Sequence, residues 1–509
     1  MSSHPSPHAS PTTLVSSIFT NFPSSLIHFY PRTLTHLASE LVLAESEFVR
    51  ASQRLALIRE RLNLGIPINR FPNEILGEIF QRCLPAELVF NPQEHTLMTT
   101  STCRMTPLVL SKICRRWRSV ATGTPRLWRD IEIYISIKRY KSQISVLEDW
   151  LRYSADMPLT FILNICAQED LRFWSADPPC EIAEVLARHS ERWQTAYLAI
   201  PVASFSGIPA VPFPLLTRLT LRTASFFTVD ESKMLGMANQ ITSLELLSTP
   251  ASTYDLPKGR VQYLKARFVS AQECYDLMKK NPDLVDCYLE GPYLYPSFVY
   301  PEVLTMEKVE RLYISQYHQE CVGVFFDALT LPALRCIEFG ARANEAPHRQ
   351  LVSLVQRSGC MMQKLVLEHV DMDDTDLMDI LRAMPTLTDF RIIIMGIDHG
   401  RTMSNRLLHM LTPQHPDLRG QISLLPNLEI LDFEAPFIYE EDAMVNFLTS
   451  RWRKNRVTGV DPFYARLKHA TITNNGSAPE NDIAVRLQPL INEGMKLELV
   501  RMSHSPGTF

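Results

Sequence analysis

The sequence predicts an α/β solenoid that follows an all-α region beginning with a long helix. After residue 131, a pattern of an apolar residue, two others, an apolar residue, one other and an apolar residue recurs about every 25 residues. Before residue 131, apolar residues instead recur at helical spacings of three and four. The chain of 509 residues exceeds what one compact core usually organises, so either several domains or one extended array of repeats is expected.

The N-terminal region predicts a tail and then one long helix. Residues 1–30 are rich in Ser and Pro and predict a disordered tail. Residues 31–65 predict a helix, because nothing between Pro31 and Gly65 interrupts it and Pro67 follows. Its apolar residues form a heptad seam of Leu34, Leu37, Leu41, Ala44, Phe48, Ala51, Leu55, Ile58 and Leu62.

Such a seam predicts a partner helix, and two partners remain open. The residues flanking the seam are acidic in its first half and basic in its second. That order favours an antiparallel homodimer through residues 34–62, in which glutamates lie beside arginines. Alternatively, the helix folds back on its own chain.

Residues 66–130 predict two helical segments around a polar loop. In the first, "FPNEILGEIFQRCLP", apolar doublets recur every four positions, a stripe too wide for one ordinary surface helix. The second predicts a helix with Thr106 as N-cap, Pro107 in its first turn and Gly123 after its end. The width of the doublet stripe leaves open what its second side contacts, a partner or the rest of a wholly intramolecular helix bundle.

The repeat occupies residues 131–500, with a tail at 501–509. Its clear copies centre on Leu219, Leu244, Leu312, Ile337, Leu365, Phe390 and Leu431, and weaker ones on Ala196, Leu264, Cys287 and Ala470. Each copy predicts a short strand, and segments 270–283 and 348–359 predict helices between strands. Stacking of such units buries apolar surface that one unit alone cannot bury.

Residues 71–130 resemble an F-box. The resemblance rests on Pro72, Glu74, Ile75, Leu76, Ile79, Phe80 and Leu84, and then on Cys114, Arg116, Trp117, Leu127 and Trp128. The sequence departs from the pattern at Phe71, where Leu is usual, and in a loop of about twenty residues. Residues 131–500 resemble the irregular leucine-rich repeats found behind many F-boxes, although the usual Asn or Cys after the strand is missing.

The resemblance implies a substrate-recognition subunit of an SCF-type cullin-RING ubiquitin ligase, with no catalytic site of its own. It implies that the F-box binds a Skp-type adaptor, and through it a cullin, while the solenoid binds an unknown protein substrate. The residues expected to contact the adaptor are Phe71, Pro72, Ile75, Leu76, Ile79, Phe80, Leu84, Ile113 and Trp117. The alternative is a leucine-rich-repeat-like scaffold that acts without a ubiquitin ligase.

The solenoid also predicts where a substrate binds. In each strand, the residue between the last two inward positions faces the open side of the sheet. Among these positions and their neighbours, we expect contacts from Lys265, Arg267, Tyr288, Tyr313, Glu338 and Arg391. Basic residues lie mainly in the early repeats and acidic ones in the late repeats, a gradient that would orient a dipolar partner. A plain solvated sheet face explains the same pattern.

Composition argues against other classes of function. A net charge of −4 gives no strong field for nucleic acid or a membrane, and no run of eighteen apolar residues exists. The ten cysteines are scattered without a CxxC pair, which favours reduced thiols in the cytoplasm or nucleus. No nucleophile, phosphate-loop or zinc-protease motif occurs, so neither a cofactor nor a metal is expected, and a hydrolase with an unrecognised site is the third hypothesis.

For three charged motifs, a specific binding function must be weighed against a purely structural role. The stretch "DMDDTDLMDI" suggests a cation loop but lacks its glycine and glutamate, so helix N-capping is the preferred interpretation. The arginines of "CRRWRS" suggest a basic patch for nucleic acid, but a solvated helix face is the preferred interpretation. Residues 451–456, "RWRKNR", suggest contacts with phosphates or RNA, but a surface turn in a late insertion is preferred. His369 and His399 have no metal-ligand spacing.

Overall fold

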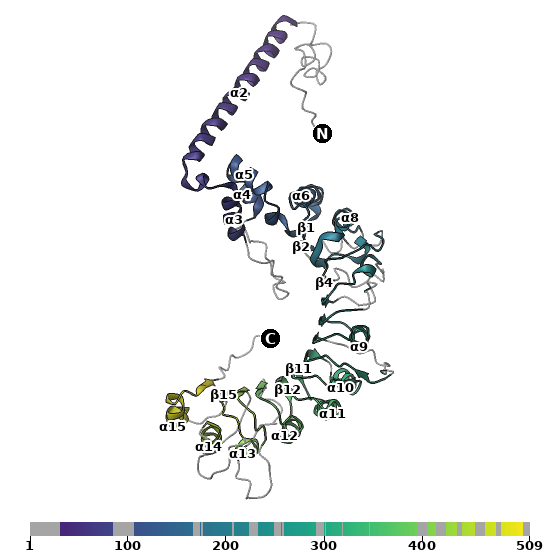
Figure 1. Cartoon of the computed structure of the whole chain (residues 1–509), viewed down its shortest axis with the longest axis vertical. Coiled ribbons are helices and arrows are strands. Elements are labelled where there is room, and N and C mark those ends of the chain that lie inside the picture. Colours follow the sequence, from purple (N-terminus) through teal and green to yellow (C-terminus); the bar gives the residue numbers. More distant parts are fainter. Residues whose placement is uncertain are drawn as a thin grey trace. The chain divides into compact units, whose positions relative to one another are not determined.

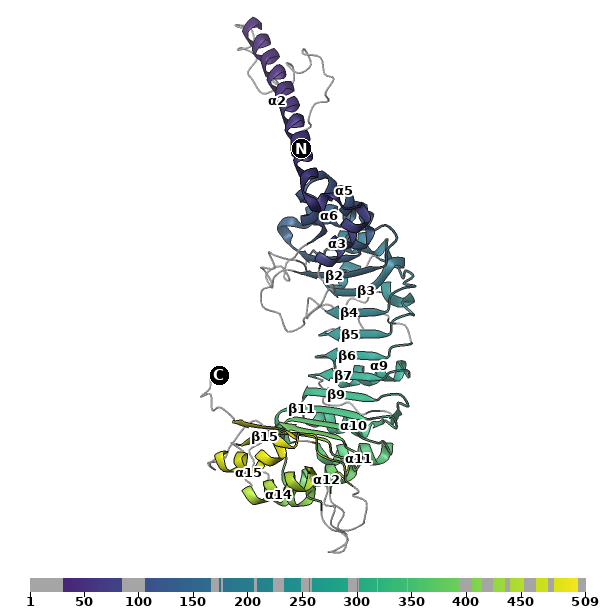
Figure 2. The ribbon, with the colours of Figure 1, turned by 60° about the vertical axis from the view of Figure 1, so that its left-hand side comes forward.

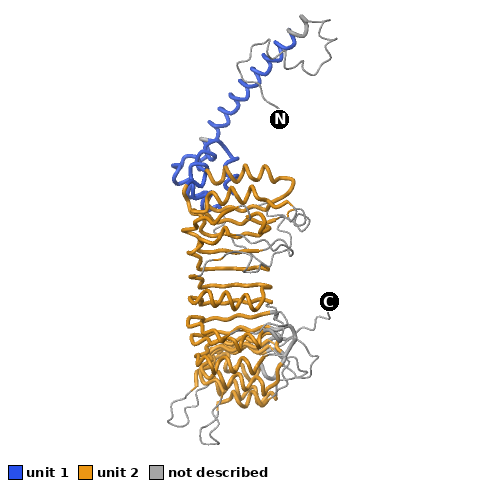
Figure 3. The backbone as a smooth tube through the Cα atoms, turned by 90° about the vertical axis from the view of Figure 1, so that its right-hand side faces the viewer, with its two compact units in different colours: residues 1–128, 153–155 blue, residues 129–152, 156–509 orange. Residues whose placement is uncertain are grey.

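The structure is a computed structural model. It describes residues 31–84, 106–165, 174, 177–205, 208–222, 233–248, 256, 259–291, 300, 302–317, 319–345, 347–393, 405–413, 424–434, 440–452, 464–474 and 480–501. The expected tail at 1–30, residues 502–509 of the tail expected at 501–509, His399 and the end of "RWRKNR" lie outside the described residues. Arg501, placed in that tail by the sequence, is instead the last residue of β16 (Lys496–Arg501). The chain divides into two compact units, residues 1–128 with 153–155 and residues 129–152 with 156–509 (Figure 3).

Unit 1 is helical. It contains α2 (Pro31–Gly65), η2 (Pro67–Arg70), α3 (Asn73–Cys83), α4 (Pro107–Ile113), α5 (Arg115–Thr122) and η3 (Pro125–Trp128). The long helix expected at 31–65 is confirmed as α2, which ends at the predicted Gly65 because Pro67 cannot continue it.

The second helical segment of unit 1 is divided where the sequence predicts one continuous helix. Thr106 is the expected N-cap, and its Oγ1 accepts the N–H of Val109 at 3.4 Å. Gly123 follows the last helical residue, also as expected. Cys114, however, adopts extended dihedrals and its Sγ accepts the N–H of Trp117 at 3.4 Å, so it starts a new helix. The break changes the direction of the chain between Ile113 and Trp117.

The core of unit 1 forms around two aromatic rings. The ring of Phe80 lies 4.7 Å from that of Trp117, centroid to centroid, which joins α3 to α5. Trp117 Nε1 donates to Asn69 Oδ1 at 2.5 Å, and Asn69 Nδ2 donates to the carbonyl of Asn63 at 2.7 Å. The buried Asn69 therefore ties the end of α2 to α5 while satisfying the indole N–H.

Unit 2 is mixed α/β, with one long parallel sheet whose strands lie in chain order (Figure 2). Its fourteen strands are β1 (Asp130–Ile135), β2 (Leu159–Ile165), β3 (Trp193–Ala199), β4 (Arg218–Arg222), β5 (Ser243–Leu247), β6 (Tyr263–Arg267), β7 (Asp286–Glu290), β9 (Arg311–Tyr317), β11 (Cys336–Glu345), β12 (Lys364–Asp371), β13 (Asp389–Ile393), β14 (Ile430–Glu434), β15 (His469–Asn474) and β16 (Lys496–Arg501). A separate pair joins β8 (Leu304–Thr305) to β10 (Leu329–Thr330).

The register of the sheet follows the repeat in the sequence. The predicted central residues pair directly from Ala196 and Leu219 in the early strands to Phe390 and Leu431 in the late ones. Sequence reasoning missed β1, β2 and β16, which lie at the two ends of the sheet. Their signal is simple alternation, as in "IEIYI" at 131–135, which carries no copy of the repeat.

Helices cover one face of this sheet and leave the other open (Figure 1). The connections contain α6 (Tyr140–Tyr153), α8 (Cys180–Ala187), α9 (Ala271–Lys280), α10 (Gln319–Asp327), α11 (His348–Ser358), α12 (Asp374–Ala383), α13 (Asn405–Leu411), α14 (Glu441–Trp452) and α15 (Glu480–Asn492), and the 3₁₀ turns η4 (Ile137–Arg139), η5 (Ser190–Arg192), η6 (Val202–Phe205) and η7 (Met234–Met237). The two expected helices are confirmed as α9 and α11. A capping box between Ser270 and Glu273 begins α9.

The core of unit 2 lies between the strands and these helices. Inward strand residues such as Leu365 and Phe390 are completely buried and pack on helix residues such as Leu354 and Leu377. In β6 and β7 the outward residues are half-buried, so these strands alternate as the period of two predicts. Other outward residues, such as Tyr197 of β3 and Val366 of β12, are buried. None of the described helices is long and apolar enough to cross a membrane.

Candidate interaction surfaces

Helix α3 has two apolar sides with different environments. Leu76 and Phe80 are completely buried in unit 1, whereas Ile75 is 46% exposed and Ile79 is half-buried. Residues four apart lie on one side of a helix, so the buried pair and the more exposed pair form two adjacent stripes. The width of the doublet stripe is thus explained on one side by the core of the unit, and the other side remains available.

The expected adaptor contacts divide accordingly. Phe71, Pro72, Ile75 and Ile113 are exposed, while Ile79, Leu84 and Trp117 are half-buried. Leu76 and Phe80 offer no surface, so the interpretation of these two as direct contacts is corrected: they hold α3 against α5. The break at Cys114 accounts for the exposure of Ile113, which the predicted continuous helix placed on the buried face.

The arginines of "CRRWRS" make contacts within unit 1. Arg116 Nη2 donates to the carbonyl of Phe71 at 2.6 Å and lies 3.4 Å from Asn73 Oδ1, which fixes the entry to α3. Arg118 Nε donates to the carbonyl of Ser111 at 3.0 Å, and Arg115 lies 3.8 Å from Glu60 of α2. Sequence reasoning treated these arginines as a solvated face and missed Arg116 and Asn69 as positioning residues.

The seam of α2 is exposed along its whole described length. Its large residues Leu37, Leu41, Phe48, Leu55, Ile58 and Leu62 are between 48% and 73% exposed. The side chain of Leu34 lies outside the described residues. The other described residues of unit 1 therefore do not cover the seam, which stays available for a partner helix.

The open face of the unit 2 sheet carries the expected row of outward residues. Lys265 pairs in register with Tyr288, Tyr288 with Tyr313, and Tyr313 with Glu338, so the row follows one line across neighbouring strands. The rings of Tyr288 and Tyr313 lie 5.7 Å apart, and the ring of Tyr263 lies 5.3 Å from that of Tyr288. Three tyrosines thus form a continuous aromatic strip at the middle of the sheet.

Opposite charges on this face pair across adjacent strands. Arg267 lies 3.1 Å from Glu290 and Lys364 lies 2.6 Å from Glu338. Arg391 lies 3.2 Å from Asp432 and 3.6 Å from Glu434. Part of the charge on this face is therefore paired at contact distance. The expected gradient from basic to acidic repeats stays a prediction.

Burial affects ionisation on the open face. Burial raises the pKa of Glu245, against the lowering effect of Lys265 in the next strand. Burial also raises the pKa of Asp432, opposed by Arg391, and the pKa values of the Tyr288 and Tyr313 phenols. The tyrosine strip is therefore neutral at physiological pH and can contact both apolar groups and hydrogen-bonding groups.

A strained turn at the strand ends was not predicted. Ser248, Phe268 and Gly291 each follow a strand and have positive φ angles of 56°, 53° and 61°. Each donates its N–H to the carbonyl of a residue in the next strand at 2.7 Å. Phe268 is 45% exposed. The central carbon of the Arg267 guanidinium lies 5.1 Å from the centroid of the Phe268 ring. Positive φ is costly for a bulky residue, so this exposed aromatic is an unusual feature at the edge of the open face.

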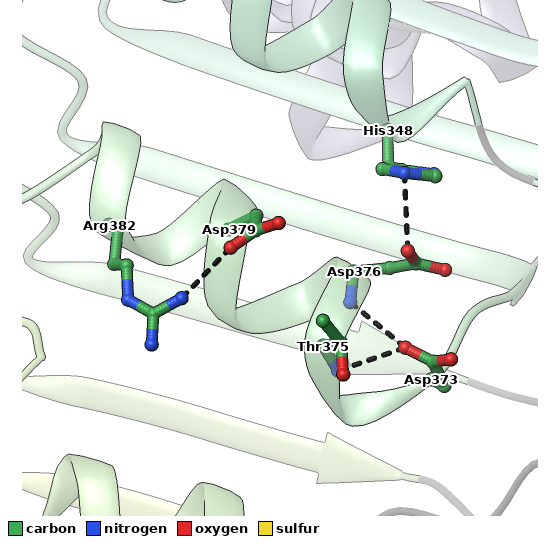
Figure 4. Close-up of polar contacts among 6 residues, drawn as sticks. All are labelled: His348, Asp373, Thr375, Asp376, Asp379 and Arg382. Carbon is green, nitrogen blue, oxygen red and sulfur yellow. Dashed lines mark hydrogen bonds and ion pairs between the residues drawn. The ribbon is translucent and has the colours of Figure 1, made fainter.

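The acidic stretch at 371–376 is a helix cap, as expected (Figure 4). Asp373 Oδ1 accepts the N–H groups of Thr375 and Asp376, each at 2.9 Å, at the start of α12. The carboxylate of Asp376 lies 3.1 Å from His348 Nε2, which links α12 to α11. Within the described part of the chain, no group of His, Cys, Asp and Glu side chains could hold a metal ion.

The basic stretch at 451–456 begins inside the protein. Arg451 is buried, and its guanidinium donates to the carbonyls of Leu411, Leu424 and Leu425 at 2.6 to 2.9 Å. Burial lowers the pKa of Arg451 to about 10. Both expectations are therefore wrong for Arg451: it lies buried in α14 and not in a surface turn, and its donors already bind carbonyls, so they cannot bind phosphates.

No protein-family model matches the chain, and no curated protein matches it either. The surfaces described above are thus the basis for assigning a function.

Proposed function

We propose that this protein is the substrate-recognition subunit of an SCF-type cullin-RING ubiquitin ligase. The exposed side of α3 and its entry binds a Skp-type adaptor, and the open face of the unit 2 sheet binds a protein substrate. One observation carries the proposal: α3 exposes Ile75 and the preceding Phe71 while Leu76 and Phe80 lock the same helix in place.

An exposed apolar stripe on a rigid helix suits a helix-in-groove interface. Phe71 is 47% exposed and Ile75 is 46% exposed, so each has surface left to bury. Full burial of such a side chain contributes about 1.5 to 3 kcal/mol, before the cost of association is subtracted. The hydrogen bond from Arg116 to the Phe71 carbonyl fixes the entry to α3, so little backbone order has to be gained on binding.

The proposal also includes a fold class for unit 2 that is more specific than mixed α/β. We assign unit 2 to the irregular, leucine-rich-repeat-like α/β solenoids. The assignment is supported by one strand for each repeat, in chain order, with helices on the other face (Figure 1). We place the protein in the cytoplasm or nucleus, where the free thiols stay reduced.

The substrate surface centres on the tyrosine strip. Tyr288 and Tyr313 provide amphipathic contact area at low entropic cost, and such residues often dominate binding energy. The paired charges around them, such as Lys364 with Glu338, favour a partner that brings its own polar groups to the rim. Of the six expected contacts, Lys265 pairs in register with Tyr288 and so borders the strip, whereas Arg391 lies three strands beyond Tyr313.

Reconstitution with purified Skp adaptor, cullin and RING subunits tests the proposal. We expect the full chain to join the complex, and the Ile75→Asp variant to stay outside it with its unit 1 folded. A chain that binds a protein ligand through the sheet but binds no adaptor would overturn the ligase assignment and leave the scaffold alternative.

A further inference from the structure

We propose that α2 forms an antiparallel homodimer with the α2 helix of a second copy of this chain. The proposal is independent of the ligase function. It rests on three features of the described residues: the exposed seam, the volumes of the side chains along it, and the charges that flank it.

The geometry of unit 1 leaves the seam open. In the heptad that starts at Leu34, Glu60 occupies the f position, which lies opposite the a and d positions. Glu60 is the residue through which α2 contacts Arg115 of α5. The helix is therefore tied to the rest of unit 1 by the side away from the seam, and Phe48 at the middle of the seam is 73% exposed.

The volumes of the seam residues favour an antiparallel arrangement. A parallel pair in register would place Ala44 opposite Ala44, Ala51 opposite Ala51 and Phe48 opposite Phe48. The two alanine layers would then contain voids, and the phenylalanine layer between them would be overcrowded. In an antiparallel pair each a residue faces a d residue. Placing Leu37 opposite Leu62 then puts Leu41 opposite Ile58, Ala44 opposite Leu55 and Phe48 opposite Ala51. Each alanine thus faces one of the large residues, and every layer holds a similar volume.

The flanking charges independently select the same register. In this arrangement the g positions pair with one another, so Glu40 lies beside Arg61 and Glu47 beside Arg54 of the second copy. All four side chains are exposed and point along the flank of the seam. A parallel pair would instead set Glu40 beside Glu45 and Arg54 beside Arg59. The antiparallel dimer therefore has four favourable g pairs, where the parallel one has four repulsive pairs.

A homodimer would present two sheet faces in one assembly. Two linked binding surfaces increase the effective concentration of the second site once the first is occupied. A substrate with two copies of a recognised segment would then bind more tightly than a substrate with one.

Sedimentation of the full chain at micromolar concentration tests the dimer. We expect a dimer mass for the wild-type chain. Arg54→Glu places two glutamates side by side at both Glu47–Arg54 pairs and should weaken dimerisation by about tenfold or more. Arg50→Glu is the matched control, because it changes the charge equally at a c position outside the interface and should leave the dimer intact. A monomeric wild-type chain, or equal effects of the two variants, would overturn the proposal.

Mixing and cross-linking test the partner and the orientation. The variants Glu40→Lys/Glu47→Lys and Arg54→Glu/Arg61→Glu should each be mainly monomeric, and their mixture should dimerise, because opposite charges meet again. A benzophenone residue at position 62 should cross-link to the region around residue 37 of an isotope-labelled second copy. Cross-links between the two positions 62 would show a parallel pair, and links only within one copy would show fold-back; either result contradicts the proposal.

Discussion

The two units use the same kinds of side chain in opposite ways. In the unit 2 sheet, the inward apolar residues of each strand are buried completely, and the open face carries tyrosines and paired charges. In unit 1, α2 and α3 leave leucine, isoleucine and phenylalanine side chains exposed. Unit 2 therefore completes its own core by stacking repeats, whereas unit 1 has apolar surface that its own described residues do not cover. Under the proposed function, unit 1 would bind its partner through burial of this surface, and unit 2 would bind through polar and aromatic contacts.

The largest expected effect separates buried from exposed residues within α3. Phe80→Ala should lower the free energy of unfolding of unit 1 by about 3 to 5 kcal/mol, because it leaves a cavity beside Trp117. Ile75→Ala on the exposed side of the same helix should lower it by less than about 1 kcal/mol. Denaturant titration followed by tryptophan fluorescence measures both values. Equal losses for the two variants would contradict the division of α3 into a core side and a contact side.

A smaller effect is expected on the open face of unit 2. Arg267→Glu places two carboxylates together at Glu290 and should lower the free energy of unfolding by about 1 kcal/mol. The exchange Arg267→Glu with Glu290→Arg should recover most of that loss, because the pair forms again with its charges reversed. The same denaturant titration detects this coupling. If the double variant is no more stable than Arg267→Glu, the charges on this face do not act as local pairs.

The smallest effect concerns pH. Burial raises the pKa of Glu245 in the folded state, so the folded protein binds this proton more tightly than the unfolded chain does. Stability from this group is complete below the unfolded pKa of 4.5 and is lost as the pH rises through the folded pKa. Glu245→Gln should therefore increase the free energy of unfolding at neutral pH, and the increase should disappear below about pH 4.5. A constant difference over this pH range would contradict the assignment.

The sequence predicted the repeated part of the fold well and its exceptions poorly. The spacing of residues such as Leu219 and Leu244 fixes both the strands and their register, since a slip of one residue would turn every apolar side chain outward. The capping residues Thr106, Gly123 and Asp373 were also predictable, because each satisfies backbone groups next to it in the chain. Contacts between neighbours in the sequence are the ones that a single sequence records directly.

The features that were missed depend on contacts distant in the chain. Asn69 accepts a hydrogen bond from Trp117, and Arg116 binds the Phe71 carbonyl, each more than forty residues away. The break at Cys114 was hidden because its apolar neighbours continue a helical spacing. The pairing of Arg267 with Glu290 likewise requires the register of β6 and β7. Composition along the row suggested a charge gradient but could not show which charges pair.

Direct titration of the purified full chain with purified Skp adaptor tests the central claim, that the exposed side of α3 is an interaction surface. We predict saturable binding to the wild-type chain with a negative heat capacity change, which marks burial of apolar surface. The Ile75→Asp variant should lose this binding, because an unpaired charge would be placed in the apolar contact, while its unfolding transition stays close to that of the wild type. Absence of binding to the wild-type chain, or equal binding by Ile75→Asp, would contradict the account.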